Sequence, residues 1–141
     1  MDVQINVLAV FLAAASSMVI GSIWYSKSVF GETWGKLAKV KMDGKPKPEE
    51  MAWLMGTTFI ASLLMAYILA HVTFLAHTFF QNSFMQDALS TGFWLWLGFV
   101  VTRLYVHDAF EGRRKKLTLL NIAHEFVTIM AMALIIGAMS I

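Results

Sequence analysis

The segment GFWLWLGFVVTRLYVHDAFEGRRKKLTLLNIAHEFVT, residues 92–128, decides how the chain folds. It joins an apolar, tryptophan-rich run to a basic turn, and that turn to a second apolar run. Such a pattern is typical of two antiparallel helices that cross a membrane and share a short charged turn. Ionisable residues inside the apolar runs are costly in lipid, so they are candidate functional positions.

The composition of the whole chain also indicates a membrane protein. Of its 141 residues, 58% are hydrophobic and 14% are charged, with a mean hydropathy of +0.65. Soluble domains carry about 25% charged residues. The chain contains no cysteine, which excludes disulfides, thiolate metal sites and cysteine nucleophiles.

Four apolar runs are long enough to cross a bilayer, and they span about residues 5–25, 51–80, 88–106 and 117–141. The sequence therefore predicts an all-α, integral membrane bundle of four transmembrane helices, folded as one domain over residues 1–141. As a helix, the second run would be about 45 Å long, which exceeds the hydrocarbon thickness of about 30 Å. We expect that helix to tilt or to project from the bilayer.

The basic residues predict the orientation. All lysines and arginines fall within residues 27–47 and 103–116. The positive-inside rule places the loops 26–50 and 107–116 in the cytoplasm and both termini outside. The distribution follows topology, so we expect no nucleic-acid partner. The N-terminus has no basic region typical of a signal peptide, and we expect the first run to be retained.

Between the first two runs, apolar and basic residues alternate at helical spacing. This pattern predicts a short amphipathic helix in the headgroup plane, with its lysines toward anionic lipids. The expected membrane-interface residues are Trp24, Tyr25, Phe30, Trp34, Lys36 and Lys39. For Trp24 and Tyr25 an alternative stays open, in which the two rings line an inner cavity.

Small residues recur along the apolar runs and predict close helix packing. The expected packing positions are Ala13, Ser17, Gly21, Ser62, Ala66, Ala70, Gly98 and Gly137. These residues are also simply common in membrane helices. Because they exceed the needs of one contact, we expect the protein to form a homo-oligomer.

A polar patch is predicted where the third and fourth runs meet the basic turn. Its members are Arg103, His107, Asn121, His124, Glu125 and Thr128. The last four share one helical face by their spacing. Antiparallel packing of the third and fourth runs makes an ion pair between Arg103 and Glu125 geometrically easy, with His124 or His107 as a second partner. The patch either fastens the helices or lines a pathway for a proton, an ion or a small solute.

The chemistry of a cofactor or an enzyme has little support. The histidines His71, His77, His107 and His124 form no HExxH motif, and no two of them lie level enough for haem ligation. We therefore expect no metal and no cofactor. No arrangement of nucleophile and base is present, so an enzymatic activity is not favoured.

Three blocks resemble a known family: GSIWYSKSVFGETW (21–34), GFWLWLGFVVT (92–102) and FEGRRKKLTLLNIAHEF (110–126). They are similar to DUF1761, a family of small bacterial membrane proteins of unknown function. The resemblance implies a four-helix integral protein of the bacterial inner (cytoplasmic) membrane, and it assigns no activity, cofactor or site.

Two functions are consistent with the sequence. The first is an oligomeric protein that transports or binds a small solute, an ion or protons at the polar patch. The alternative is a scaffold or lipid-interaction protein without transport, in which the patch is purely structural.

Overall fold

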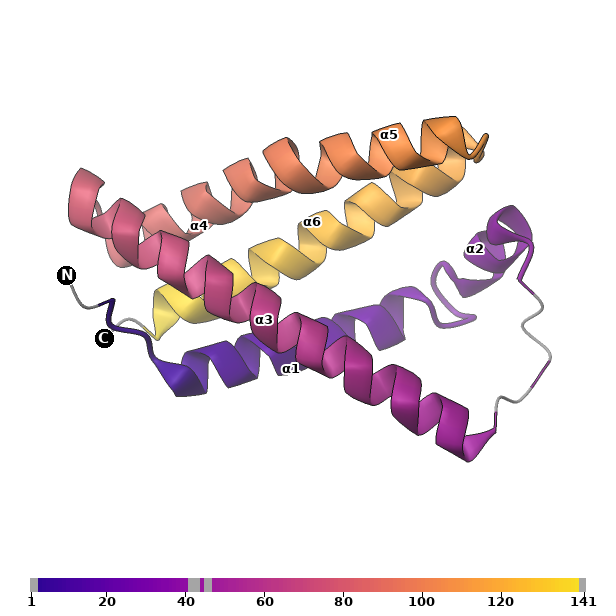
Figure 1. Ribbon diagram of the computed structural model, residues 1–141, viewed down its shortest axis with the longest axis horizontal. Helices are drawn as coiled ribbons and strands as arrows, with labels where there is room; N and C mark the ends of the chain where they lie inside the picture. The colour runs from indigo at the N-terminus through magenta and orange to yellow at the C-terminus, as the bar shows by residue number, and fades with distance from the viewer. Residues whose placement is uncertain (1–2, 41–43, 45–46, 140–141) are drawn as a thin grey trace.

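The computed structural model describes residues 3–40, 44 and 47–139 of the chain. The helices are α1 (Val7–Trp24), α2 (Gly31–Ala38), α3 (Pro48–Phe80), α4 (Phe84–Leu95), η1 (Trp96–Val101), α5 (Thr102–Phe110) and α6 (Lys115–Ala138). In the described ranges there is no β-strand. The elements α4, η1 and α5 follow one another without a break and form one long rod (Figure 1).

Four of these helical segments are long and apolar enough to cross a membrane: Val7–Trp24, Pro48–Phe80, Phe84–Phe110 and Lys115–Ala138. The prediction of an all-helical fold with four helices of membrane-spanning length and apolarity is thus confirmed. The third segment begins at Phe84, earlier than the predicted start near residue 88. The reason is a capping box, in which Ser83 and Gln86 satisfy each other's backbone N–H groups.

The two ends of the bundle differ in character. The start of α1, the end of α6 and the α3–α4 turn lie at one end, which we call the terminal end (Figure 1). The helix α2, the start of α3 and the α5–α6 turn lie at the other end, which we call the basic end (Figure 1). At the terminal end, the side-chain amide of Asn6 donates a hydrogen bond of 2.9 Å to the carbonyl oxygen of Met139. This bond ties α1 to α6.

Small side chains let the long helices approach one another closely. The core combines residues of α1, α3 and α6, and Met132 at its centre is completely buried. Ser17 on α1 donates a hydrogen bond of 2.8 Å to Ser62 on α3. A side chain at Gly137 would collide with Met85, because an added Cβ would lie 2.8 Å from its sulfur. In lipid, such packing and hydrogen bonding replace the hydrophobic drive between helices.

The small residues predicted for helix packing are therefore used mainly inside the chain. Ala13, Ser17, Ser62, Ala66, Ala70 and Gly137 are buried, and Gly21 is half-buried. Gly98 differs, since it is exposed and an added Cβ would meet nothing within 4 Å. Internal packing explains most of the pattern that had suggested self-association.

Helix α3 leaves the bundle toward the basic end. Residues 48–58 are all exposed, whereas Ser62, Ala66, Leu69 and Ala70 are buried. Figure 1 shows α3 crossing the bundle obliquely and diverging from α1 on this side. With 33 residues, α3 is about 50 Å long at 1.5 Å per residue. That length exceeds a hydrocarbon layer of about 30 Å, so in a membrane the helix would either tilt or project from the layer.

The rod contains a π-helical turn at Trp96–Val101. Trp96 anchors this turn to α6, because its indole N–H donates a hydrogen bond of 3.1 Å to the carbonyl oxygen of Ile122. Its ring also packs against Phe126, with 4.7 Å between ring centroids. A π-helical turn adds a residue to the helical repeat. Side chains beyond it are rotated relative to the positions that regular α-helical counting predicts.

Candidate functional site

A pocket of about 510 Å³ lies between α1, α3 and α6, on the side where α3 leaves the bundle. We call it the α1–α3–α6 pocket. Its lining residues are Ser17, Met18, Gly21, Ser22, Tyr25, Met55, Thr58, Ala61, Ser62, Met65, His124, Glu125, Thr128 and Met132. The volume falls within the range of about 300–1,000 Å³ that small-molecule sites occupy.

Glu125 is the acidic residue of this pocket. Its side chain is 30% exposed, and that of the neighbouring His124 is 13% exposed. The distance from His124 Nδ1 to Glu125 Oε1 is 3.4 Å, which meets the ion-pair criterion. It lacks hydrogen-bond geometry, and both ring nitrogens of His124 are buried without a hydrogen-bond partner in the described structure. Along α6, Glu125 lies about 15 Å from Lys115, deep in the apolar segment.

Two aromatic residues at the end of α1 pack on the histidine ring. The ring centroids of Trp24 and Tyr25 lie 5.7 and 4.9 Å from that of His124. The hydroxyl of Tyr25 also donates a hydrogen bond of 3.3 Å to the side-chain oxygen of Asn121. Tyr25 thus lines the pocket. This position corresponds to the alternative in which the rings of Trp24 and Tyr25 line a cavity. Trp24 packs on the ring of His124 but is not a lining residue of the pocket. Its indole N–H is buried and has no hydrogen-bond partner in the described structure.

Three hydroxyl groups of the pocket donate their hydrogens to their own helices, whereas the buried hydroxyl of Thr128 has no hydrogen-bond partner in the described structure. Ser22 donates to the carbonyl oxygen of Met18 at 2.8 Å, and Thr58 to that of Leu54 at 2.7 Å. Ser62 donates to the carbonyl oxygen of Thr58 at 2.9 Å. Each hydroxyl has one hydrogen, so the lone pairs of Ser22 and Thr58 remain available, whereas the oxygen of Ser62 already accepts a hydrogen bond from Ser17. Ser22, Thr58 and the Glu125 carboxylate therefore offer acceptors to the pocket, and Thr128 offers a hydroxyl that can donate or accept.

The predicted polar patch divides into two groups. Asn121, His124, Glu125 and Thr128 lie together on α6, and the last three line the pocket. Arg103 and His107 are exposed on α5 and contact each other, with 3.1 Å from Arg103 Nη2 to His107 Nε2. The expected ion pair between Arg103 and Glu125 is wrong, because Glu125 contacts only His124 among the charged residues described. The π-helical turn directly before α5 changes the direction in which Arg103 points.

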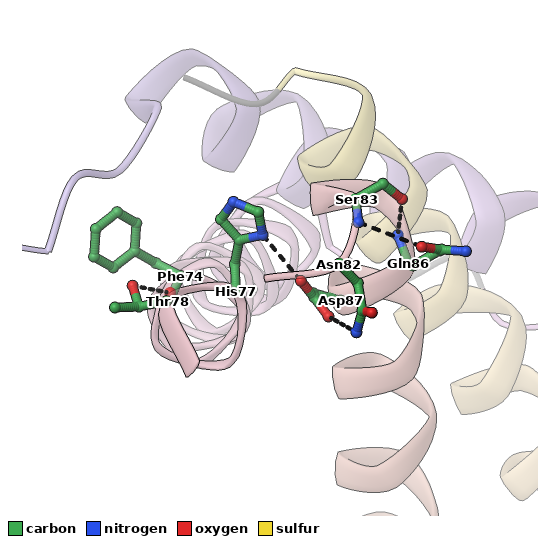
Figure 2. A network of polar contacts seen from close by, with 7 residues as sticks. All are labelled: Phe74, His77, Thr78, Asn82, Ser83, Gln86 and Asp87. Carbon is green, nitrogen blue, oxygen red and sulfur yellow. Dashed lines mark hydrogen bonds and ion pairs between the residues drawn. The ribbon is translucent and has the colours of Figure 1, made fainter. Parts of the chain in front are cut away.

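Two buried aspartates were not predicted as functional or structural sites. At the terminal end, Asp87 is 3% exposed. Its carboxylate accepts a hydrogen bond of 3.0 Å from Asn82 and lies 2.9 Å from Nδ1 of His77 (Figure 2). This cluster joins the end of α3 to the start of α4. In the sequence, this cluster is indicated only by one acidic residue, Asp87, next to the capping residues Ser83 and Gln86.

At the basic end, Asp108 holds the α5–α6 turn. It is 5% exposed, and its carboxylate accepts a hydrogen bond of 2.6 Å from Thr118. Arg113 lies at 3.6 Å from the second carboxylate oxygen. Both buried aspartates are thus fully engaged in contacts between adjacent helices.

Two other observations bound the possible chemistry. Within the described ranges, no three side chains of His, Asp or Glu gather as metal ligands would. A second groove of about 510 Å³ lies between α3, the α4–η1 rod and α6. Its lining is apolar throughout: Ala61, Leu64, Met65, Ile68, Leu69, Leu95, Phe99, Val100 and Ile129. This second groove suits acyl chains and holds no polar group for chemistry.

One of three comparisons with known proteins identifies a family. A family model described as a protein of unknown function, DUF1761, matches residues 8–137. Comparisons with curated proteins and with solved structures gave no match. The family match covers nearly the whole chain, including all but the end residues of the four long helices and all the pocket residues. This chain therefore belongs to the DUF1761 family, whose function is unknown.

Proposed function

We propose that this protein binds and transports a small solute, an ion or protons through the α1–α3–α6 pocket. The proposal rests on the surroundings of the Glu125 side chain. A carboxylate deep in an apolar helix is costly unless it is paired or serves a function. Glu125 is partly exposed to a pocket of ligand size and, within the described structure, accepts no hydrogen bond.

The two buried aspartates provide an internal comparison. Asp87 and Asp108 are at most 5% exposed, and each accepts hydrogen bonds from the neighbouring helix or turn. Such satisfaction is what a structural role in a membrane protein requires. Glu125 lacks it, which favours a role toward a ligand over a role in fastening the helices.

Transport is tested with purified protein in sealed vesicles. Proton, sodium and potassium flux is measured for the wild type, for Glu125→Gln and for Glu111→Gln. Glu111 is an exposed carboxylate in the α5–α6 turn, so its variant is a matched control for loss of one charge. We expect flux of at least one ion in the wild type and in Glu111→Gln, reduced about tenfold in Glu125→Gln, which corresponds to about 1.4 kcal/mol. Equal flux in all three proteins and in empty vesicles contradicts transport.

We also infer a cytoplasmic position for the basic end, with α2 in the headgroup layer. This inference is supported by the positions of the basic residues and by α2 itself. Gly31 and Gly35 of α2 are buried, whereas Lys36 and Lys39 are exposed. If α2 grips anionic headgroups, Lys36→Gln/Lys39→Gln retains less anionic lipid in native mass spectrometry. Unchanged lipid retention, or labelling of a cysteine at position 36 from outside the cell, contradicts it. The alternative function, a lipid-interaction scaffold, depends only on the exposed lysine surface of α2.

A further inference from the structure

We infer that the α1–α3–α6 pocket takes a singly charged organic cation with an apolar body, such as a substituted ammonium or phosphonium ion. This inference rests on the proposed function and names the ligand class of the same pocket. Three features carry it: the sign of the charge, the direction of the hydroxyl hydrogens and the apolar walls.

The charge of the lining is negative. Glu125 is the acidic lining residue, and no lysine or arginine lines the pocket. The guanidinium expected to neutralise it, that of Arg103, is exposed on α5 and contacts His107 instead. A cation that enters the pocket therefore gains a counter-charge in Glu125, and an anion meets a carboxylate whose one ion-pair neighbour in the described structure is His124.

Three hydroxyl groups of the lining also favour a cation, whereas the hydroxyl of Thr128, without a partner in the described structure, can donate or accept. Ser22, Thr58 and Ser62 donate their hydrogens to carbonyl groups of their own helices. The oxygens of Ser22 and Thr58 therefore keep their lone pairs for a positively polarised ligand, while that of Ser62 already accepts one hydrogen bond from Ser17. The ring of Tyr25, which also lines the pocket, adds a face that attracts cations.

The walls favour an apolar body over a bare ion. Four methionines line the pocket: Met18, Met55, Met65 and Met132. Their flexible, polarisable thioethers adapt to ligands of different shape. A divalent metal would need three or more well-placed polar ligands, or about six oxygens for calcium or magnesium. The described residues offer one carboxylate and no cluster of metal ligands.

The test uses tetraphenylphosphonium and tetraphenylborate, two ions of the same shape and opposite charge. Binding to the purified protein in zwitterionic detergent is measured by isothermal titration calorimetry, with empty micelles as the blank. The proteins are the wild type, Glu125→Gln, Glu111→Gln and Ser22→Trp. Ser22 is exposed on α1, so its replacement fills the pocket mouth without entering the core. Circular dichroism establishes that each variant is folded.

We expect the wild type and Glu111→Gln to bind tetraphenylphosphonium at least about tenfold more tightly than tetraphenylborate, a difference of about 1.4 kcal/mol. Glu125→Gln should lose this preference, and Ser22→Trp should lose binding of the cation. If the wild type binds both ions equally and Ser22→Trp abolishes this binding, the cation inference is overturned, but the pocket remains a solute site. Failure of both ions to bind also overturns it, and the flux measurement then decides the proposed function independently.

Discussion

The buried cluster around Asp87 predicts a measurable loss of stability when its carboxylate is removed. In Asp87→Ala, the bond from Asn82 at 3.0 Å and the contact with His77 at 2.9 Å are both lost. Interhelical polar contacts in membranes contribute about 0.6 kcal/mol on average and up to about 1.7 kcal/mol. His77 is 39% exposed, which places its contact toward the lower value.

A further contribution comes from the position of Asp87 in the first turn of α4. A negative charge there interacts favourably with the helix dipole by about 0.3–1 kcal/mol. Together these contributions give a loss of about 2 kcal/mol in the free energy of unfolding for Asp87→Ala. His77→Ala alone should lose less, because Asn82 still holds the carboxylate.

The assay is reversible unfolding in mixed micelles with increasing sodium dodecyl sulfate, followed by circular dichroism. A double-mutant cycle of His77→Ala and Asp87→Ala should give a coupling free energy of about 0.6 kcal/mol. Ser90→Ala, an exposed position on the same helix, is the control and should change stability by less than about 0.5 kcal/mol. A loss for Asp87→Ala no larger than that of the control refutes the reasoning.

The remaining predictions use matched pairs of positions. Gly137→Ala should destabilise the protein by about 1–3 kcal/mol, because its Cβ would lie 3.0 Å from the backbone of Met85. Gly98→Ala should be neutral or slightly stabilising, since its Cβ meets nothing and alanine favours helix; the reverse order in the unfolding assay contradicts the packing. Asp108→Ala should cost about 1–3 kcal/mol, because it leaves the buried Thr118 hydroxyl without its acceptor. Arg113→Ala should cost less than about 1 kcal/mol, since its side chain is 47% exposed; equal losses for the two variants would show that the carboxylate is held mainly by the arginine.

The fold was predictable because it depends on features that extend over many residues. The four apolar runs exceed the length needed to cross a bilayer, and lipid permits few structures other than helices for such runs. The face of α6 that carries His124, Glu125 and Thr128 was also predictable from regular helical spacing. The structure brings these three residues to one pocket.

The partners of that face were not predictable from spacing. The π-helical turn at Trp96–Val101 interrupts regular counting before Arg103, and nothing in the local pattern indicates it. The contribution of α3 to the pocket depends on the angle at which that helix crosses α1. This angle follows from packing between distant residues such as Ser17 and Ser62, which a single sequence does not reveal.

The divergence of α3 from α1 toward the basic end determines the route by which a ligand enters the pocket. The wall formed by Met55, Thr58, Ala61 and Met65 is exposed along its length, so the pocket opens sideways. Amphiphilic molecules accumulate in acyl chains in proportion to their oil–water partition. Their local concentration beside this opening can therefore exceed that in the surrounding water by orders of magnitude. Affinities expressed per aqueous concentration should then scale with partition, so a weak intrinsic site would suffice for effective capture.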